Sequence, residues 1–278
     1  MSRYSILIDI AKCNGCYNCF LACRDEYYGN DYPSYSAAQP LNGQFWMQIK
    51  EIERGVYPKP KVSYLPIPCM HCEDAPCMDA AKDDAIYRRA DGIVMIDPEK
   101  AKGQPDIVNA CPYRIIYWNE EKQIPQKCTM CAHRLDEGEK LPRCVESCPT
   151  GALVFGDLDD PQSEISKLSA SAETESLHPE FNTASSVQYI GIPKRFVTGE
   201  IVYSDNEGEC APGVSIKLSG AGQDRETVTD IFGDFEFEGL DKNATYTVAV
   251  VVDGYEGLEI EFTTYSDVNL GEIELDPK

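Results

Sequence analysis

The sequence predicts two domains of different class, an α+β domain in the N-terminal part followed by an all-β sandwich. Three observations lead to this prediction. The chain has 278 residues, about twice the usual length of one domain. Twelve of its thirteen cysteines lie before residue 150. Short runs with strand-like alternation recur from Phe196 onward. We therefore expect a cysteine-rich domain over residues 1–155, a linker over residues 156–195 and a β-rich domain over residues 196–278.

The composition indicates a folded protein that does not bind polyanions. Apolar residues make up 42% of the chain and charged residues 26%, which is enough apolar surface for packed cores. No run approaches the roughly 18 consecutive apolar residues that a membrane-spanning helix needs. The formal net charge is −22, of which −15 falls on residues 196–278, and it would repel nucleic acids and anionic lipids. We expect neither as a partner, and no membrane insertion.

The N-terminal residues do not have the pattern of an export signal. Met1–Ile10 holds one arginine and a short apolar stretch that runs directly into Asp9 and Lys12, without a small-residue cleavage site. We expect a cytoplasmic protein, or one that is exported in folded form with a signal-bearing partner.

The first cysteine group has the spacing of an iron-sulfur cluster loop. Its four thiols fall within eleven residues and read Cys13-x2-Cys16-x2-Cys19-x3-Cys23. A cubane cluster has iron corners several ångströms apart, and a tight loop with a thiol at every third residue can reach three of them. The fourth cysteine of such a run lies too far along the chain and binds another cluster, as in two-cluster ferredoxins.

Two further groups bring the number of matched thiols to twelve. The last group repeats this logic with a longer middle and reads Cys128-x2-Cys131-x12-Cys144-x3-Cys148-Pro149. The central group reads Cys69-x2-Cys72-x4-Cys77 and is followed much later by Cys111-Pro112. Twelve thiolates fill three four-iron clusters and leave none over. The thirteenth cysteine, Cys210, stands alone, and we assign it no role.

Two other uses of these cysteines fit the sequence less well. A disulfide framework needs an oxidising compartment and usually an even number of cysteines, whereas this chain has thirteen. Three zinc sites would fit the number of thiols, but structural zinc sites typically use two cysteine pairs separated by a loop. His71 and His133 lie in or beside the cysteine runs, where residues next to a ligand point elsewhere, so we do not expect them to be ligands.

At these motifs, from about Tyr4 to Phe155, the chain resembles the iron-sulfur subunits that accompany molybdopterin enzymes of the dimethyl sulfoxide reductase family. The resemblance implies a ferredoxin-like fold in two pseudo-symmetric halves. Such subunits usually hold four 4Fe-4S clusters on sixteen cysteines, and neighbouring cysteine groups exchange their fourth ligand. The resemblance also implies a heterodimer with a large catalytic subunit that carries bis-molybdopterin guanine dinucleotide. This chain has no motif for that cofactor, and we expect no catalytic residue in it.

Four of the family's cysteines are absent, and the ligand exchange assigns all four to one cluster. The corresponding residues are Ala81, Ala101, Gln104 and Ile107. The resemblance therefore implies three clusters. The first would have Cys13, Cys16, Cys19 and Cys148 as ligands, the second Cys128, Cys131, Cys144 and Cys23, and the third Cys69, Cys72, Cys77 and Cys111.

Three clusters and an additional C-terminal domain narrow the resemblance to one branch of this family, the small subunits of transhydroxylases and related enzymes that act on polyphenols. In this branch the resemblance extends over nearly the whole chain. Its motifs include Pro68–Glu73 (PCMHCE), Asp91–Val94 (DGIV), Asp97–Gly103 (DPEKAKG) and Gln126–His133 (QKCTMCAH).

The C-terminal part is predicted to form seven short strands separated by turns of Gly, Asn and Asp, which is typical of a β-sandwich. The predicted strands are 196–203, 213–219, 226–230, 234–238, 245–252, 258–263 and 268–275. The positions of several Gly and Tyr residues resemble those of carboxypeptidase regulatory-like or transthyretin-like modules, which implies packing or partner binding. A long insertion, Arg24 to Pro68, either contacts a partner, covers a site or packs on its own domain.

Three functions are compatible with the sequence. The first is an electron-transfer subunit, because thiolate-bound clusters span about −700 to +450 mV and three in one small domain suit a relay. The second is a structural subunit, because transhydroxylation is redox-neutral overall. The third is an electron relay for a reductive relative such as a catechol dehydroxylase. Turnover with and without an external electron donor would distinguish these functions. Lys127 and Arg143, each next to a ligand, either tune cluster potentials or are solvated surface charges.

Overall fold

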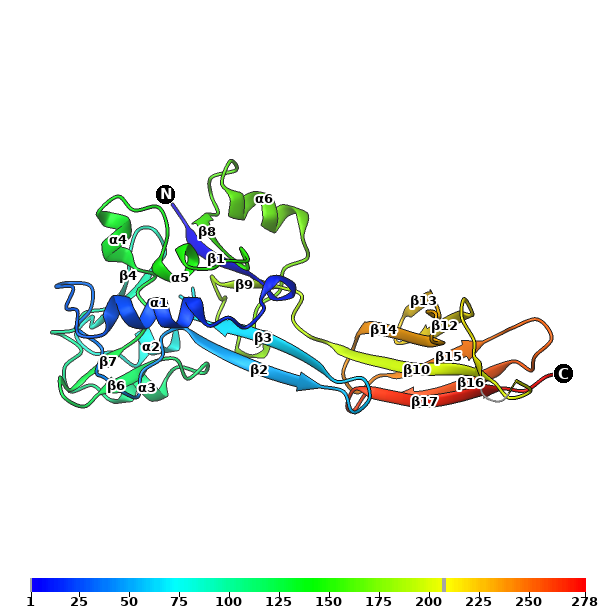
Figure 1. The fold of residues 1–278 in the computed structure, drawn as a ribbon. Coiled ribbons are helices and arrows are strands. Elements are labelled where there is room, and N and C mark those ends of the chain that lie inside the picture. The colour runs from blue at the N-terminus through cyan, green and yellow to red at the C-terminus, as the bar shows by residue number, and fades with distance from the viewer. Residues whose placement is uncertain (1, 207–208) are drawn as a thin grey trace. The chain divides into compact units, whose positions relative to one another are not determined.

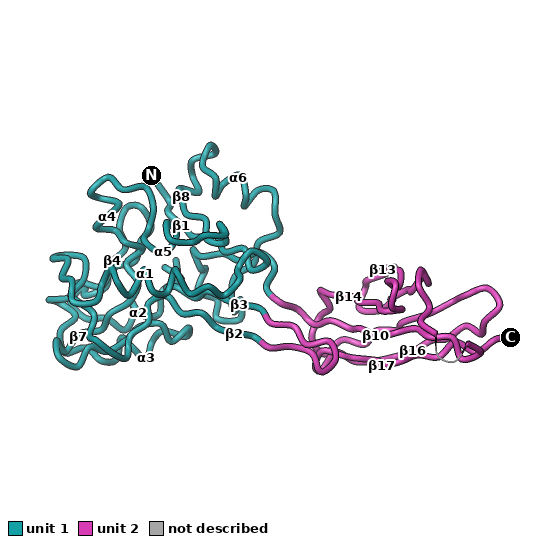
Figure 2. The backbone as a smooth tube through the Cα atoms, viewed as in Figure 1, with its two compact units in different colours: residues 1–52, 63–192 teal, residues 53–62, 193–278 magenta. Residues whose placement is uncertain are grey.

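The chain forms two compact units in the computed structural model, which describes residues 2–206 and 209–278 (Figure 1, Figure 2). Unit 1 comprises Met1–Ile52 and Ser63–Ile192, and unit 2 comprises Glu53–Val62 and Pro193–Lys278. Each unit has an apolar core of its own. Among the described residues, no helix combines the length and the apolar character that crossing a bilayer requires.

A three-stranded sheet supports unit 1. Its strands, in spatial order, are β8 (Leu153–Asp157), β1 (Tyr4–Asp9) and β9 (Gln188–Ile190). β1 is antiparallel to β8 and parallel to β9. The side chains of β1 alternate between two cores, with Ile6 and Ile8 in the main core and Leu7 beneath α6 (Glu164–Ser171). Because both faces of β1 are covered, its apolar residues are consecutive.

The segment expected to be a linker, residues 156–195, instead belongs almost entirely to unit 1. It contributes α6, which Ser163 caps through the N–H of Ser166 (3.2 Å), and the edge strand β9. Val187 and Tyr189 are fully buried in the main core. The boundary between the units therefore lies near Pro193, well beyond the last cysteine of the cluster runs.

Short elements connect the cysteine groups of unit 1. Two hairpins are formed by β4 (Ile86–Arg88) with β5 (Val94–Ile96), and by β6 (Tyr117–Asn119) with β7 (Ile124–Gln126). The helices are α1 (Asn18–Tyr27), α2 (Pro76–Asp79), α3 (Asp106–Asn109), α4 (Ala132–Asp136) and α5 (Arg143–Glu146). Two 3-10 turns are η1 (Ile10–Lys12) and η2 (Pro179–Phe181). Regular structure is therefore sparse where the thiols lie.

The long insertion forms a hairpin whose tip is part of unit 2. Its strands are β2 (Gln48–Arg54) and β3 (Lys61–Ile67). At the tip, Lys59 pairs with Asp234, and Lys61 pairs with Glu236 and Glu238. The lysines of the tip thus neutralise acidic side chains of the sandwich. The sequence did not indicate this use of the insertion.

Unit 2 consists of two four-stranded sheets around one core. One sheet contains β11 (Glu209–Cys210), β10 (Arg195–Tyr203), β14 (Asp234–Leu240) and β17 (Val268–Leu275). The other contains β13 (Gln223–Val228), β12 (Ser215–Gly220), β15 (Thr245–Val250) and β16 (Leu258–Thr263). All seven predicted strands are present with small shifts at their ends, and β11 is an additional short one. Phe235 and Phe237 of β14 face the core, as the alternation predicts.

Candidate iron-sulfur centres

The first CxxC loop of each of the three cysteine groups has the same backbone conformation. In each loop the residue two positions after the first cysteine has a positive φ, at Gly15 (+69°), His71 (+43°) and Met130 (+53°). This conformation turns the N–H of that residue back to the first thiol. The N–H of His71 donates to Cys69 Sγ (3.5 Å), and that of Met130 donates to Cys128 Sγ (3.3 Å). Burial raises the pKa of Cys13, and the N–H of Gly15 opposes that effect. Such bonds favour a thiolate over a thiol.

The two Cys-Pro turns also share a conformation. The residue three positions after the cysteine has a positive φ, at Arg114 (+55°) and Gly151 (+66°). Backbone N–H groups of the following residues therefore converge on Cys111 and Cys148. Burial raises the pKa of Cys148, but the N–H groups of the turn outweigh it, and this pKa is lowered. At Cys111 burial has the larger effect and the pKa is raised, so only the Cys148 turn lowers the pKa of its thiol.

A pair of helices brings the first and last cysteine groups together. α1 packs against α5 (Figure 1). α1 carries Cys19 and Cys23, and α5 carries Cys144 with Cys148 just after its end. Residues four apart lie on the same face of a helix, one turn from each other. Each helix therefore presents two thiols that are one helical turn apart, and we call these two positions its levels.

The electrostatic neighbours of these thiols show how the two levels match. After burial, the charge of Cys148 is a cause of the raised pKa of Cys19, which is about 12. The pKa of Cys23 is raised by burial and then by the charges of Cys128 and Cys131. Cys148 therefore lies with the first group, whereas Cys23 lies with the last one.

The central cysteines line one cavity. It is bounded by Cys69, Cys72, Cys77 and Cys111, together with apolar side chains and Lys127. Burial is the main reason why the pKa of Cys72 is raised to about 11 and that of Cys77 to about 12. Four thiols in an apolar cavity, with N–H groups aimed at two of them, are a donor set that suits a 4Fe-4S cluster. Within the described part of the chain, no three His, Cys, Asp or Glu side chains converge as ligands of a single metal ion do.

The positions of the four absent cysteines are filled by packing and hydrogen bonds. Ala101 and Ile107 are fully buried in a small core, and Ala81 packs against that core. Gln104 accepts a hydrogen bond from the N–H of Lys82 (2.8 Å) and donates to the carbonyl of Lys100 (2.8 Å). These four positions thus contribute apolar packing and hydrogen bonds instead of thiols.

Each histidine near the cysteine runs uses one ring nitrogen in a contact within the chain. His71 is buried, and its Nδ1 accepts the N–H of Val94 (3.1 Å). His133 pairs through Nε2 with Glu26 (2.9 Å) and stacks on Tyr32, with ring centroids 3.8 Å apart. Both side chains are held by the protein itself.

Tyr27 is a site residue that the spacing of the thiols alone does not identify. Its hydroxyl bonds Thr129 Oγ1 (2.7 Å), and it also lowers the pKa of Cys131, where burial has the larger, opposite effect. Tyr27 follows Cys23 by four residues on α1, so helical periodicity would have placed it on the thiol-bearing face.

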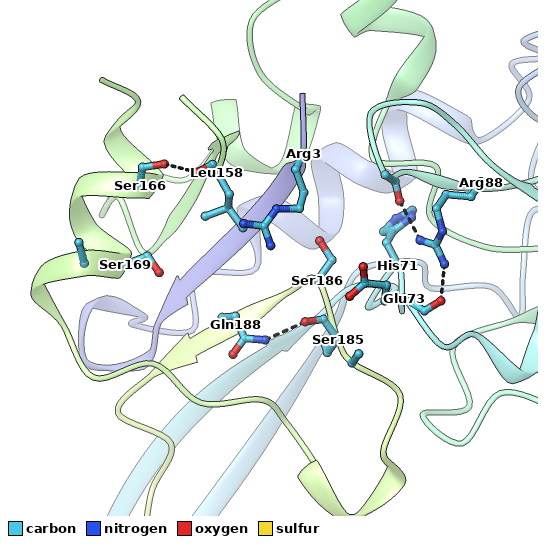
Figure 3. Close-up of a pocket in the computed structure, with 13 residues that line it drawn as sticks. Arg3, His71, Glu73, Arg88, Leu158, Ser166, Ser169, Ser185, Ser186 and Gln188 are labelled. Carbon is cyan, nitrogen blue, oxygen red and sulfur yellow. Dashed lines mark hydrogen bonds between the residues drawn. The ribbon is translucent and has the colours of Figure 1, made fainter. Parts of the chain in front are cut away.

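Arg88 fixes the backbone beside Cys72. Its guanidinium donates to the carbonyls of Cys72 (2.7 Å), Glu73 (2.7 Å) and Gly92 (3.2 Å). It stands at the edge of a polar pocket of about 460 Å³ (Figure 3). His71 lines both this pocket and the cavity of the central cysteines, so it lies between the two spaces.

Gly15 is required in the first loop because of its neighbour as well as its φ. A Cβ at this position would lie 2.5 Å from the ring of Tyr64 on β3. Replacing Gly15 by alanine is therefore expected to cost about 1–3 kcal/mol of folding free energy, measured as the shift in denaturant unfolding of the purified protein. Gly103→Ala is the matched control, since Gly103 has φ +76° with no atom within 4 Å. Equal losses in both variants would contradict the steric role of Tyr64.

Thiols gathered by CxxC loops and Cys-Pro turns define a protein of the 4Fe-4S class, and the family model described as a 4Fe-4S dicluster domain matches residues 60–158. The chain is 40% identical to the pyrogallol hydroxytransferase small subunit of Pelobacter acidigallici, over 99% of this chain and 100% of that protein. It is 36% identical to a tetrathionate reductase subunit of Salmonella typhimurium, over 70% of this chain and 75% of that protein. The arsenate respiratory reductase iron-sulfur subunit of a Shewanella species is 30% identical, over 68% of this chain and 96% of that protein.

The chain belongs to the family of iron-sulfur subunits of dimethyl sulfoxide reductase-type molybdopterin enzymes. It is accordingly an iron-sulfur electron-transfer subunit with 4Fe-4S clusters. Identity to the pyrogallol hydroxytransferase small subunit extends across unit 2 as well as unit 1.

Proposed function

We propose that the chain binds three 4Fe-4S clusters and exchanges electrons with a molybdopterin cofactor held by a large partner subunit that acts on polyphenols. The clusters would supply one-electron carriers, and the residues of this chain would hold them, orient them and set their potentials. The first site is Cys13, Cys16, Cys19 and Cys148; the second is Cys128, Cys131, Cys144 and Cys23; the third is Cys69, Cys72, Cys77 and Cys111.

The observation that carries this proposal is the packing of α1 against α5, which brings the first and last cysteine runs together. The effect of Cys148 on the pKa of Cys19, and of Cys128 and Cys131 on that of Cys23, supports an exchange of the fourth ligand between the two runs. The shared conformations of the CxxC loops and Cys-Pro turns support two ferredoxin-like halves related by pseudo-symmetry.

The surroundings of the thiols support a linear order of the three sites. The charges of Cys23 and, more weakly, Cys19 raise the pKa of Cys144, which connects the second site to the first. The charge of Cys69 contributes to the raised pKa of Cys128, which connects the second site to the third. Cys16 is exposed, whereas Cys131 and Cys144 are buried. Electrons would then pass between this chain and its partner at the first site, and the second site would carry them within the chain.

A polyphenol as substrate of the partner subunit is supported by the identity over the full length of the pyrogallol hydroxytransferase small subunit. A reductive reaction, such as catechol dehydroxylation, would use the same relay with electrons from outside. Turnover of the purified complex with and without an external electron donor distinguishes the two, because only a reductive enzyme stops when the donor is withheld.

Anaerobically purified protein is expected to contain about twelve iron atoms per chain, four for each of three clusters. Iron and zinc are measured by elemental analysis, and reduced clusters are counted by electron paramagnetic resonance. About sixteen irons, or zinc in their place, would contradict the three-cluster assignment. Co-purification with a molybdenum-containing subunit tests the partner.

A further inference from the structure

Lys127 is a buried cation without a carboxylate partner. The residue is 3% exposed, although it stands directly before Cys128 in a loop. Its ammonium donates to the carbonyls of Val94 and Cys128. Among the residues that the structure describes, no Asp or Glu forms an ion pair with it. A buried ammonium is costly unless a negative charge lies near, and two neutral carbonyls do not supply one.

The side chain is held between the proposed second and third sites. It belongs to the loop of Cys128, and it lines the cavity of Cys69, Cys72, Cys77 and Cys111. Burial raises the pKa of Cys77, and the charge of Lys127 is the next largest cause and opposes it. The same charge also acts on Cys128, where it is the smallest of several causes. The Lys127 side chain thus lines the cavity of the third site, and its charge also reaches Cys128 of the second site.

A single residue of β5 fixes this position. The carbonyl of Val94 accepts from Lys127, and the N–H of Val94 donates to Nδ1 of His71 in the loop of the third site. The ammonium thus cannot move toward solvent without breaking its hydrogen bonds to Val94 and Cys128. Its charge is unscreened by water or salt at this depth.

We propose, on the basis of the proposed function, that the Lys127 ammonium is the countercharge of the third cluster and raises its reduction potential, with a smaller effect on the second. A cubane bound by four thiolates is an anion, and one-electron reduction makes it more negative by one charge. A fixed buried cation stabilises the reduced form more than the oxidised form, which raises the potential. No proton or covalent bond takes part in this effect.

Arg143, the other basic residue next to a ligand, does not have this role. Its side chain is 37% exposed and pairs with Glu146 (2.7 Å) and Glu26 (3.7 Å). Two carboxylates and solvent cancel its charge. The burial of Lys127 and the exposure of Arg143 thus separate two residues that are equivalent in sequence.

The test is a redox titration, followed by electron paramagnetic resonance, of the full-length protein as it is purified from cells. Lys127→Met removes the charge at similar volume, Lys127→Gln retains a hydrogen-bond donor, and Lys127→Arg retains the charge. Lys140→Met is the matched control, because Lys140 is an exposed lysine of the same cysteine run. The expected result is a lower potential for one cluster, and a smaller decrease for a second, in the Met and Gln variants. The Lys127→Arg variant and the Lys140→Met control should retain the wild-type reduction potentials.

Wild-type iron content tests the proposed function separately, because a wild-type protein without three clusters contradicts that function before any Lys127 variant is compared. Unchanged potentials in fully loaded Met and Gln variants would overturn the role of Lys127. If both neutral variants lose the iron of one cluster, the Lys127→Arg variant distinguishes the charge of lysine from its shape. Retained iron and potentials in Lys127→Arg support the countercharge, whereas loss in that variant too would show that the shape of lysine, not its charge, is required.

Discussion

Replacing Cys23 by alanine is expected to remove the cluster of the distant last cysteine group and to spare the cluster of Cys23's own run. On α1, Cys23 lies one turn beyond Cys19 and next to Cys128 and Cys131. Its loss leaves the second site with three thiols, while the first keeps all four. Iron should fall from about twelve to about eight atoms per chain.

The reciprocal variant, Cys148→Ala, should damage the site of Cys13, Cys16 and Cys19. Cys148 lies in the last run by sequence but beside the first group in space. Both variants should leave the third site unchanged. Cys210→Ala is the control, since that thiol lies in β11 and donates to Glu200 (3.7 Å), and this variant should retain all iron.

The identity of the lost cluster is measured by comparing the electron paramagnetic resonance spectra of the two variants with the wild type. Direct proof comes from an experimental structure of the wild type, in which iron-sulfur bonds of roughly 2.3 Å would identify each ligand, by analogy with tetrahedral metal-thiolate bonds. Cys23 and Cys13 on the same cluster would refute the exchange. It would also remove the reason for assigning Ala81, Ala101, Gln104 and Ile107 to one lost cluster.

A chain that ends at Pro193 is expected to keep its iron, whereas a chain that ends at Phe155 is expected to lose it. The first truncation removes residues 194–278 of unit 2 and retains every residue of unit 1, together with the hairpin tip. The second also removes β9 and the fully buried Val187 and Tyr189. Deleting two such core side chains and an edge strand costs several kcal/mol, which is comparable to the whole stability of a domain.

Iron content and thermal unfolding of the two truncated proteins measure this difference. The shorter chain contains all twelve cysteines of the three groups, so cysteine content cannot explain a loss of iron. Full iron in the chain ending at Phe155 would mean that residues 156–192 are dispensable. Loss of iron in the chain ending at Pro193 would mean that unit 1 depends on the sandwich.

The sequence was sufficient where the chemistry requires a fixed spacing. Thiols at CxxC spacing and a proline after the last cysteine are local patterns that identify the candidate ligands, whereas the positive φ of His71 and Met130 is known only from the structure. The strands of unit 2 also follow, because one face of each is buried and alternation is visible in residues such as Phe235 and Phe237. Both predictions depend on short-range patterns.

The sequence was insufficient where tertiary contacts decide. β9 is short and pairs with β1 from the opposite end of unit 1's sequence, which leaves no periodic signal. Tyr189 is buried by neighbours that only the fold provides. Lys127 and Arg143 are both basic residues before a cysteine, and only burial distinguishes them.

The hairpin tip has a consequence for how this protein can be rearranged by recombination. Glu53–Val62 folds with residues 193–278, so Lys59 and Asp234, 175 positions apart, must both be made before their contact can form. Unit 2 therefore cannot be completed during synthesis until nearly the whole chain has emerged. It also cannot be exchanged between relatives as a simple C-terminal cassette. A gene fusion that replaces residues 193–278 alone would leave Lys59 and Lys61 facing a foreign surface, so a functional chimera has to transfer the hairpin tip as well.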